Sequence, residues 1–434
     1  MRSSLRVLVL TLGLLSIGGA SFAQQRPAVI PAADTLFLTR SQAVALAMRA
    51  NPQLDIAREQ TLQVRAQRMQ AVAIADPVLT ASLDSLTGIH HWGSAPQRPI
   101  SISGGIPFPD KLRLRNRVGV ANIEASELAL LLLQQQVAAQ AGRLYDSVLV
   151  VRLHERDLRQ SRDFATEFLK RTEARFNAGT VPRLDVIKAQ VEVAQAANDL
   201  IANARDVANA DAALNRTLGR MSGAALIAGD SLDVPAPLPA LRVIEDAAIR
   251  VRPELRVIAA QQRGAKATTL LVRENAILPD LTVSAGRDVA LPSGIVYALG
   301  LSMPIPVFLW QHARGDFSET YHRERELAAT YRDAQAAVAQ DVRTSYATAD
   351  AALRQVVFLR DVLLPAAREA YRVSSVSYGL GGLSALDVLD ARRTLLSAQS
   401  QYATALAAAN SSRSDLERAA GASLASLLLG ASRE

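Results

Sequence analysis

The sequence of 434 residues contains no cysteine, which excludes disulfide bonds, thiolate catalysis, cysteine-ligated zinc and lipidation of an N-terminal cysteine. Aromatic residues make up only 4%, and five histidines leave few ligands for a metal enzyme. The short motifs of serine hydrolases, P-loop proteins, zinc proteases and dinucleotide-binding domains are absent from the sequence. We therefore expect no enzymatic activity, no catalytic residues, no metal site and no cofactor.

The formal net charge is +7, but the basic residues are scattered, and we expect no nucleic-acid partner. Residues 1–23 combine Arg2 and Arg6, an apolar run from Val7 to Ile17 and the small residues Ser21 and Ala23. This order predicts a secretory signal peptide, with an uncleaved anchor helix as the alternative. After residue 23 the sequence contains no run of about 18 apolar residues, so we expect no further membrane-spanning helix.

Short segments recur in the same order at an offset of about 200 residues, which indicates an internal duplication. The paired segments begin at Arg49 and Arg250, Pro77 and Pro279, Ile106 and Met303, Phe176 and Tyr378, and Leu214 and Leu416. We therefore divide the mature chain into a first repeat, 24–219, a proline-rich linker, 220–240, a second repeat, 241–421, and a C-terminal tail, 422–434.

Each repeat predicts two strands followed by two long helices. The strands are expected at about 78–86 and 99–106, and at about 280–288 and 294–303, because apolar residues alternate with polar or small ones. This alternation is typical of strands that cross an outer membrane, and an amphipathic hairpin on a soluble domain is the alternative. Four strands cannot close a barrel, so we expect three chains to form one barrel of twelve strands together.

The long helices are expected at 110–177 and 183–219, and at 312–378 and 384–420, with a kink at Pro365. At 1.5 Å per residue, a helix of 65 residues spans roughly 100 Å. The helix after residue 183 carries a heptad seam typical of coiled coils, with Asp211 as its polar member. The apolar members of this seam are Val193, Ala197, Leu200, Ala204, Val207, Leu214 and Leu218.

Three motifs carry a resemblance to a known family. They are the segment from Thr39 to Pro52, Phe176-Asn-Ala-Gly179 before Leu184-Asp185-Val, and Tyr378-Gly-Leu-Gly381 before Leu386-Asp387-Val-Leu-Asp390-Ala391. Over nearly the whole mature chain the sequence resembles the TolC family of outer-membrane efflux channels. The segment from Pro107 to Arg113 resembles the junction of the CzcC-like heavy-metal branch, although Asp110 stands where that branch carries glycine.

The resemblance implies an α+β membrane protein in the outer membrane: a homotrimer with a twelve-stranded β-barrel, continued by an α-helical barrel across the periplasm. It implies a passive exit duct for heavy metals or drugs. A periplasmic adaptor, an inner-membrane pump of RND or ABC type and outer-membrane lipid are the implied partners. A duct for type I protein secretion and a coiled-coil scaffold without a pore are the alternatives.

The resemblance also places the functional residues. The two helical turns would form the periplasmic entrance and contact the adaptor through Phe176, Gly179, Asp185, Tyr378, Gly381 and Gly382. Asp387 and Asp390, three residues apart on one helical face, would ring and constrict the pore. The alternative is that they are solvated carboxylates favoured by the start of a helix. In the first repeat Asp185 and Lys188 take their places, so the two turns are chemically unequal.

Several further residues have weaker assignments. We expect His90 and His91 to lie in a solvated external loop, and Trp92 and Trp310 to lie near strand ends. A basic stretch follows the second strand, and we expect its side chains to end the strand by extending toward water rather than to bind lipid phosphates. This stretch consists of Lys111, Arg113, Arg115 and Arg117.

Overall fold

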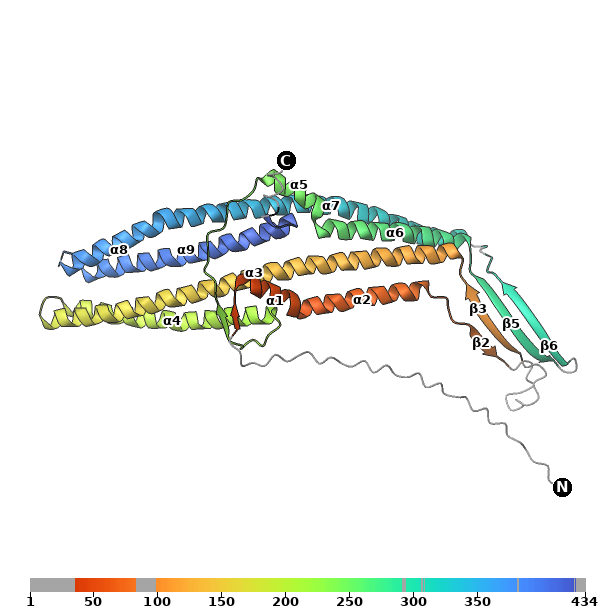
Figure 1. The fold of residues 1–434 in the computed structure, drawn as a ribbon, viewed down its shortest axis with the longest axis horizontal. Helices are drawn as coiled ribbons and strands as arrows, with labels where there is room; N and C mark the ends of the chain where they lie inside the picture. The colour runs from red at the N-terminus through yellow and green to blue at the C-terminus, as the bar shows by residue number, and fades with distance from the viewer. Residues whose placement is uncertain are drawn as a thin grey trace, which may run out of the picture.

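The computed structural model describes residues 36–424 and 426, except 83–98, 291–293, 306, 308, 381 and 425. The predicted signal peptide, His90, His91, Trp92 and Gly381 lie outside the described residues, as does the side chain of Trp310. The molecule is elongated, with strands β2, β3, β5 and β6 at one end, helices along the long axis and two helical turns at the other end (Figure 1).

The first repeat contains short elements followed by two long helices. Thr39 begins α1 with a capping box that includes Gln42, and Asn51 caps α2, which has Pro52 at its first position. The elements are β1 (Leu36–Leu38), α1 (Arg40–Ala50), α2 (Pro52–Val72), β2 (Val78–Ala81), β3 (Ile100–Ile106), α3 (Pro109–Asn177) and α4 (Arg183–Thr217). The strand β4 (Leu226–Ala228) follows in the linker.

The second repeat follows the same plan. Its elements are α5 (Leu241–Val251), α6 (Pro253–Ile277), β5 (Leu281–Ala290), β6 (Gly294–Ser302), α7 (Leu309–Phe358), α8 (Leu364–Gly379) and α9 (Ala385–Ala420). A π-helical turn, Leu359–Leu363, joins α7 to α8, whose second residue is Pro365, where the sequence predicts a kink. Among the described residues no helix has the length and apolar composition needed to cross a bilayer.

Four antiparallel strands form one sheet in the order β2-β3-β5-β6. Leu79 pairs with Ile102, Ile102 with Ala285 and Ala285 with Leu299, so these side chains share one face. Thr80, Ser101, Gly286 and Ala298 lie in the neighbouring row, on the opposite face. One face is therefore apolar and the other polar or small, and within the described chain the outer edges of β2 and β6 are unpaired.

The helices next to the sheet continue its order. α2 contacts α3, α3 contacts α6, and α6 contacts α7, which reproduces the order of the strands to which they connect. Further along, α3 pairs with α4, α8 pairs with α9, and α3 contacts α9 (Figure 1). One buried cluster includes Tyr145 of α3 and Leu214 of α4, and a second includes Ile244 of α5 and Leu416 of α9. Each cluster packs the helices of one repeat together at mid-length.

The structure differs from the sequence-based predictions in one strand pair and in the packing of α4. β1 and β4 form a parallel pair in which Leu36 aligns with Leu226, so the predicted linker contains a strand. In α4 one column of the heptad seam is shifted, because Ala197 and Ala204 are exposed whereas Ala196 and Asn203 are buried. Alanine is so frequent in α4 that the apolar pattern does not distinguish these neighbouring columns.

Candidate functional site

The turn between α3 and α4 depends on the conformation of Gly179. Its φ of 72° lies in the left-handed region, where glycine is strongly favoured. The Gly179 N–H donates to the Phe176 carbonyl over 2.9 Å, and the Thr180 N–H donates to the Arg175 carbonyl over 2.9 Å. These bonds satisfy carbonyls at the end of α3 and reverse the chain toward α4.

The turn between α8 and α9 is built differently. The Gly382 N–H donates to the Ser377 carbonyl over 2.9 Å, but Gly382 does not adopt a positive φ. Gly382 therefore does not use the left-handed conformation that Gly179 adopts. The hydrogen bond to Ser377 closes this turn.

Tyr378 joins the two turns, whereas its counterpart Phe176 faces outward. The Tyr378 ring lies 5.5 Å from the Phe168 ring, and the Arg175 guanidinium lies 4.7 Å from the Tyr378 centroid. The Tyr378 hydroxyl is buried without a hydrogen-bond partner in the described structure. Phe176 is 40% exposed. The predicted chemical inequality of the two turns thus extends to their aromatic residues.

Asp387 and Asp390 are both exposed near the start of α9, but they have different neighbours. The Asp387 carboxylate accepts hydrogen bonds from the Ser384 N–H over 2.9 Å and the Ser384 hydroxyl over 2.8 Å, completing a capping box. These bonds lower the pKa of the Asp387 carboxyl below its usual value. Asp390 lies 3.8 Å from Arg393. Asp387 therefore stabilises the start of its own helix, whatever further role it has.

The first turn lacks an equivalent cap. Pro182 occupies the N-cap position of α4 and forms no side-chain cap hydrogen bond. Asp185 lies in the first turn of α4 and is partly buried, and the Asp185 N–H donates to the Pro182 carbonyl over 3.0 Å. The structure thus brings Tyr378 against the first turn, while Phe176 and Gly179 remain exposed at its surface.

Two adjacent arginines of α9, not identified by the sequence analysis, connect the second turn to the first repeat. Arg393 forms an ion pair of 2.5 Å with Glu192 of α4, whose side chain is 13% exposed. The Arg392 guanidinium lies 5.4 Å from the Phe164 ring and 5.3 Å from the Tyr371 ring. The only signal in the sequence is a pair of charges within a helical pattern, which does not identify their partners.

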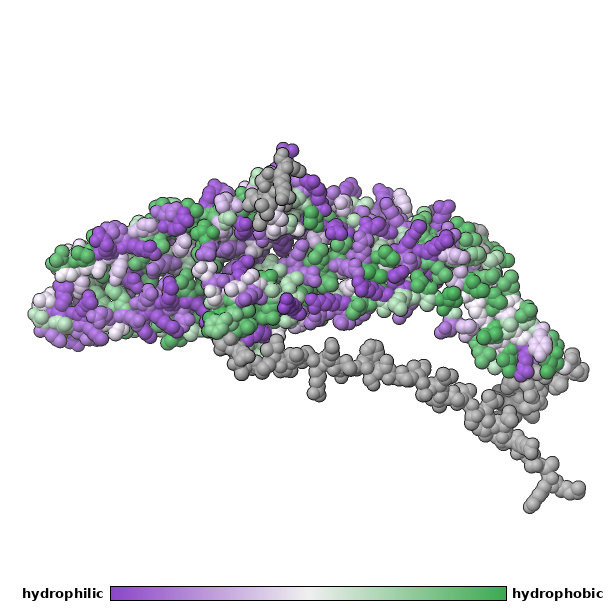
Figure 2. Space-filling model, in the orientation of Figure 1, coloured by the Kyte–Doolittle hydropathy of each residue, from purple (hydrophilic) through white to green (hydrophobic). Residues whose placement is uncertain are grey.

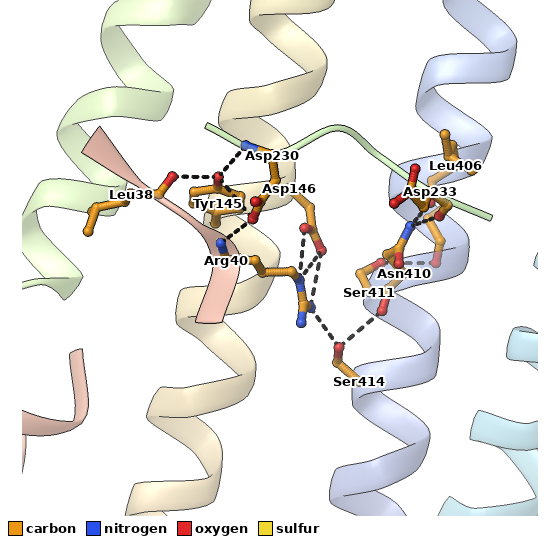
Figure 3. Close-up of polar contacts among 11 residues, drawn as sticks. Leu38, Arg40, Tyr145, Asp146, Asp230, Asp233, Leu406, Asn410, Ser411 and Ser414 are labelled. Carbon is orange, nitrogen blue, oxygen red and sulfur yellow. Dashed lines mark hydrogen bonds and ion pairs between the residues drawn. The ribbon is translucent and has the colours of Figure 1, made fainter. Parts of the chain in front are cut away.

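A second polar cluster lies at mid-length and joins the two repeats (Figure 3). The Arg40 Nε donates to Asp146 of α3 over 3.0 Å, and the Arg40 Nη2 donates to Ser414 of α9 over 2.8 Å. The Tyr145 hydroxyl donates to the Leu38 carbonyl over 2.8 Å. Burial raises the pKa of the Asp146 carboxyl, and Arg40 opposes that rise. In the sequence, Arg40 is marked only by its place in the family motif from Thr39 to Pro52.

At the strand end, Lys111 is almost fully buried and its Nζ lies 2.7 Å from Asp280. The prediction that the basic stretch extends into water is therefore wrong for Lys111. Its side chain turns inward because Asp280, directly before β5, supplies a carboxylate there. Within the described part of the chain, His, Asp and Glu side chains form no group of three or more that could hold a metal ion.

The outer membrane efflux protein family matches the chain twice, over residues 43–220 and 244–422. The chain is 24% identical to the cobalt-zinc-cadmium resistance protein CzcC of Cupriavidus metallidurans over 88% of this chain and 90% of that protein. It is 27% identical to the pyoverdine export outer membrane protein OpmQ of Pseudomonas aeruginosa over 69% of this chain and 64% of that protein.

Among solved structures, the fold is similar to the transmembrane channel CusC, with a TM-score of 0.74 and 18% identity over 92% of this chain and 98% of that one. The outer-membrane channel OprN gives a TM-score of 0.73 and 18% identity over 89% and 90%. The repeated match covers most of the chain, and the same fold recurs in these channels. The chain therefore belongs to the outer membrane efflux protein family and is an outer-membrane transport duct rather than an enzyme.

Proposed function

We propose that three copies of this chain form one channel whose twelve strands close a barrel in the outer membrane. The observation that carries the proposal is the four-stranded sheet, which has one apolar face and two outer edges unpaired within the described chain. Unpaired backbone groups are very unfavourable in hydrocarbon, and pairing β6 of one copy with β2 of the next would satisfy them.

The same arrangement supports the helical part of the channel. The layer α2-α3-α6-α7 repeats the order of the strands, so three copies would continue the barrel as a tube of helices. In this proposal the tube extends into the periplasm, and the helical turns around Phe176, Gly179, Asp185, Tyr378, Gly381 and Gly382 contact a periplasmic adaptor. That adaptor would connect the channel to an inner-membrane pump of RND or ABC type.

Asp387 and Asp390 would line the periplasmic entrance, where three copies contribute six carboxylates. Their exposure supports this placement, and rings of acidic side chains favour cations. Divalent metal ions are the cargo that we propose, because CzcC is named for cobalt, zinc and cadmium resistance. Drugs are the alternative cargo within the same function.

Single-channel recording in a planar bilayer tests the proposal. The wild type should conduct with a preference for cations, and the Asp387→Asn and Asp390→Asn variants should conduct more and lose that preference. Ser384→Ala is the matched control, because it removes the helix cap and keeps both carboxylates. A folded protein that forms no pores would refute the channel, and equal changes in the control would refute the acidic constriction.

A further inference from the structure

The apolar face of the sheet contains one charged residue among the described strand positions. The strand register places Leu79, Ile100, Ile102, Ile106, Val283, Ile295, Leu299 and Leu301 on this face. Arg287 lies on the same face, directly opposite Tyr297 in the register, whereas its neighbour Asp288 lies on the other face. Arg287 is exposed, and no carboxylate of the described residues pairs with it. An anionic group next to the apolar face would therefore stabilise the charge of Arg287.

The position of Arg287 along the strand indicates where that partner lies. Leu281 begins β5 at the helical end, next to the ion pair between Lys111 and Asp280. Arg287 follows six residues later, which is about 20 Å along a strand and about 15 Å of height at the usual tilt. The long arginine side chain can extend further, toward the far rim of an apolar band about 25 Å tall.

The position of Tyr297 also indicates that Arg287 lies near the level of the lipid headgroups. Its side chain is 78% exposed beside Arg287, and tyrosines prefer the boundary between hydrocarbon and headgroups. Hydrophobic side chains gather over this end of the molecule (Figure 2). An arginine and a phenol together offer several hydrogen-bond donors, which suit the oxygens of a phosphate group.

We propose that Arg287 and Tyr297 bind a lipid A phosphate in the outer leaflet. This inference rests on the proposed function, because it requires the apolar face to contact lipid. The occupant is an outer-leaflet lipid because Arg287 lies far from the helical end, which the proposal places in the periplasm. Each copy would provide one such contact, so a trimer would bind lipid at three points around its rim.

Native mass spectrometry of the detergent-purified protein, with added bisphosphorylated lipid A, tests the inference. Arg287→Gln should retain about fivefold less lipid A than the wild type, as expected for one basic residue near a charged surface. Arg287→Lys should recover much of the retention. The matched control is Arg205→Gln, whose side chain is 72% exposed on α4, and its retention should equal that of the wild type.

Two comparisons make the outcomes distinct. Dephosphorylated lipid A should bind wild type and Arg287→Gln equally, and a fivefold difference there would overturn the role of the phosphate. The inference would be overturned if wild type and Arg287→Gln retained bisphosphorylated lipid A equally. It would also be overturned if Arg287→Gln retained less phosphatidylglycerol than the wild type instead of less lipid A. Flotation of the wild type with liposomes reports separately on the proposed function, because a protein that does not float has no lipid-facing sheet.

Discussion

The Nζ atom of Lys111 lies 2.7 Å from Oδ1 of Asp280, which joins the first turn of α3 to the residue before β5. The two side chains differ in burial, since that of Lys111 is 3% exposed and that of Asp280 is 45% exposed. Because the ammonium is the buried partner, removal of the carboxylate and removal of the ammonium should change the stability of the protein by different amounts.

We predict that Asp280→Asn destabilises the protein more than Lys111→Met. Removal of the carboxylate leaves a buried ammonium without a partner, at a cost of about 3 kcal/mol. Removal of the ammonium leaves a half-exposed carboxylate that water can solvate, and methionine fills much of the same volume, so about 1 kcal/mol is expected. Denaturant unfolding in detergent measures both variants, and the reverse order would contradict this account of the junction.

The glycines that end the last helix of each repeat provide a second test. Gly219 and Gly421 have φ values of 68° and 70°. A Cβ at position 219 would overlap the Ala50 carbonyl oxygen, whereas at position 421 its nearest contact would be 3.4 Å from Arg252. Gly421→Ala should therefore cost about 1 kcal/mol for the left-handed conformation. Gly219→Ala should cost about 3 kcal/mol or more, because the backbone must also move.

Circular dichroism during thermal unfolding compares these two variants under one condition. Gly223→Ala is the control, since a Cβ there would meet no atom within 4 Å. Equal losses at positions 219 and 421 would show that the close approach to Ala50 has no energetic consequence.

Much of the helical and strand architecture is predictable because periodicity is a local property. The structure places α3 at Pro109–Asn177 and β3 at Ile100–Ile106, where the sequence predicts 110–177 and 99–106. The three-residue strands β1 and β4 were missed, because so short a pair has no period and depends on a partner 190 positions away. The same limit explains why β4 was assigned to a linker.

The polar contacts were less predictable than the elements. Arg40 and Asp146 are separated by 106 positions, and Glu192 and Arg393 by 201. No local pattern specifies which helices lie side by side, so such partners emerge only from the packing. The Ser384 and Asp387 cap is local, however, and its spacing of three residues could have been recognised as a capping box. The prediction for Asp387 was a pore constriction, with a favourable helix dipole as the alternative, and neither includes these hydrogen bonds.

The ion pair between Arg40 and Asp146 predicts a pH-dependent loss of stability. The Asp146 side chain is 2% exposed, and that of Arg40 is 36% exposed. Arg40→Gln leaves the buried carboxylate without a charged partner, so we expect a loss of about 2 kcal/mol at neutral pH, reduced by solvent around Arg40. Burial already raises the pKa of this carboxyl, and loss of Arg40 raises it further.

The sign of the effect follows from this raised pKa. A carboxyl whose pKa is raised in the folded state binds its proton more tightly there, so stability falls as the pH rises through that value. The difference between Arg40→Gln and wild type should therefore shrink as the pH is lowered from 7 toward 4. Unfolding free energies at several pH values measure it, with Arg205→Gln as the surface control. A difference that grows on acidification would contradict the assignment to Asp146.

The capping box at the second turn predicts the opposite pH dependence for the start of α9. The hydroxyl and N–H of Ser384 lower the pKa of Asp387 below its ordinary value of 3.8. The stabilisation is therefore complete above that ordinary value and is lost as the pH falls through the lowered pKa. The first amides of α9 should exchange slowly near neutral pH. After correction for intrinsic rates, they should be less protected from exchange at strongly acidic pH.

Ser384→Ala should reduce this protection already at neutral pH, because Asp387 loses one donor and the Asp387 N–H loses its acceptor. The first amides of α4, where Pro182 provides no side-chain cap, are the internal comparison and should not respond to the Ser384 substitution. Unchanged protection of α9 in Ser384→Ala would mean that packing, rather than the cap, holds the second turn.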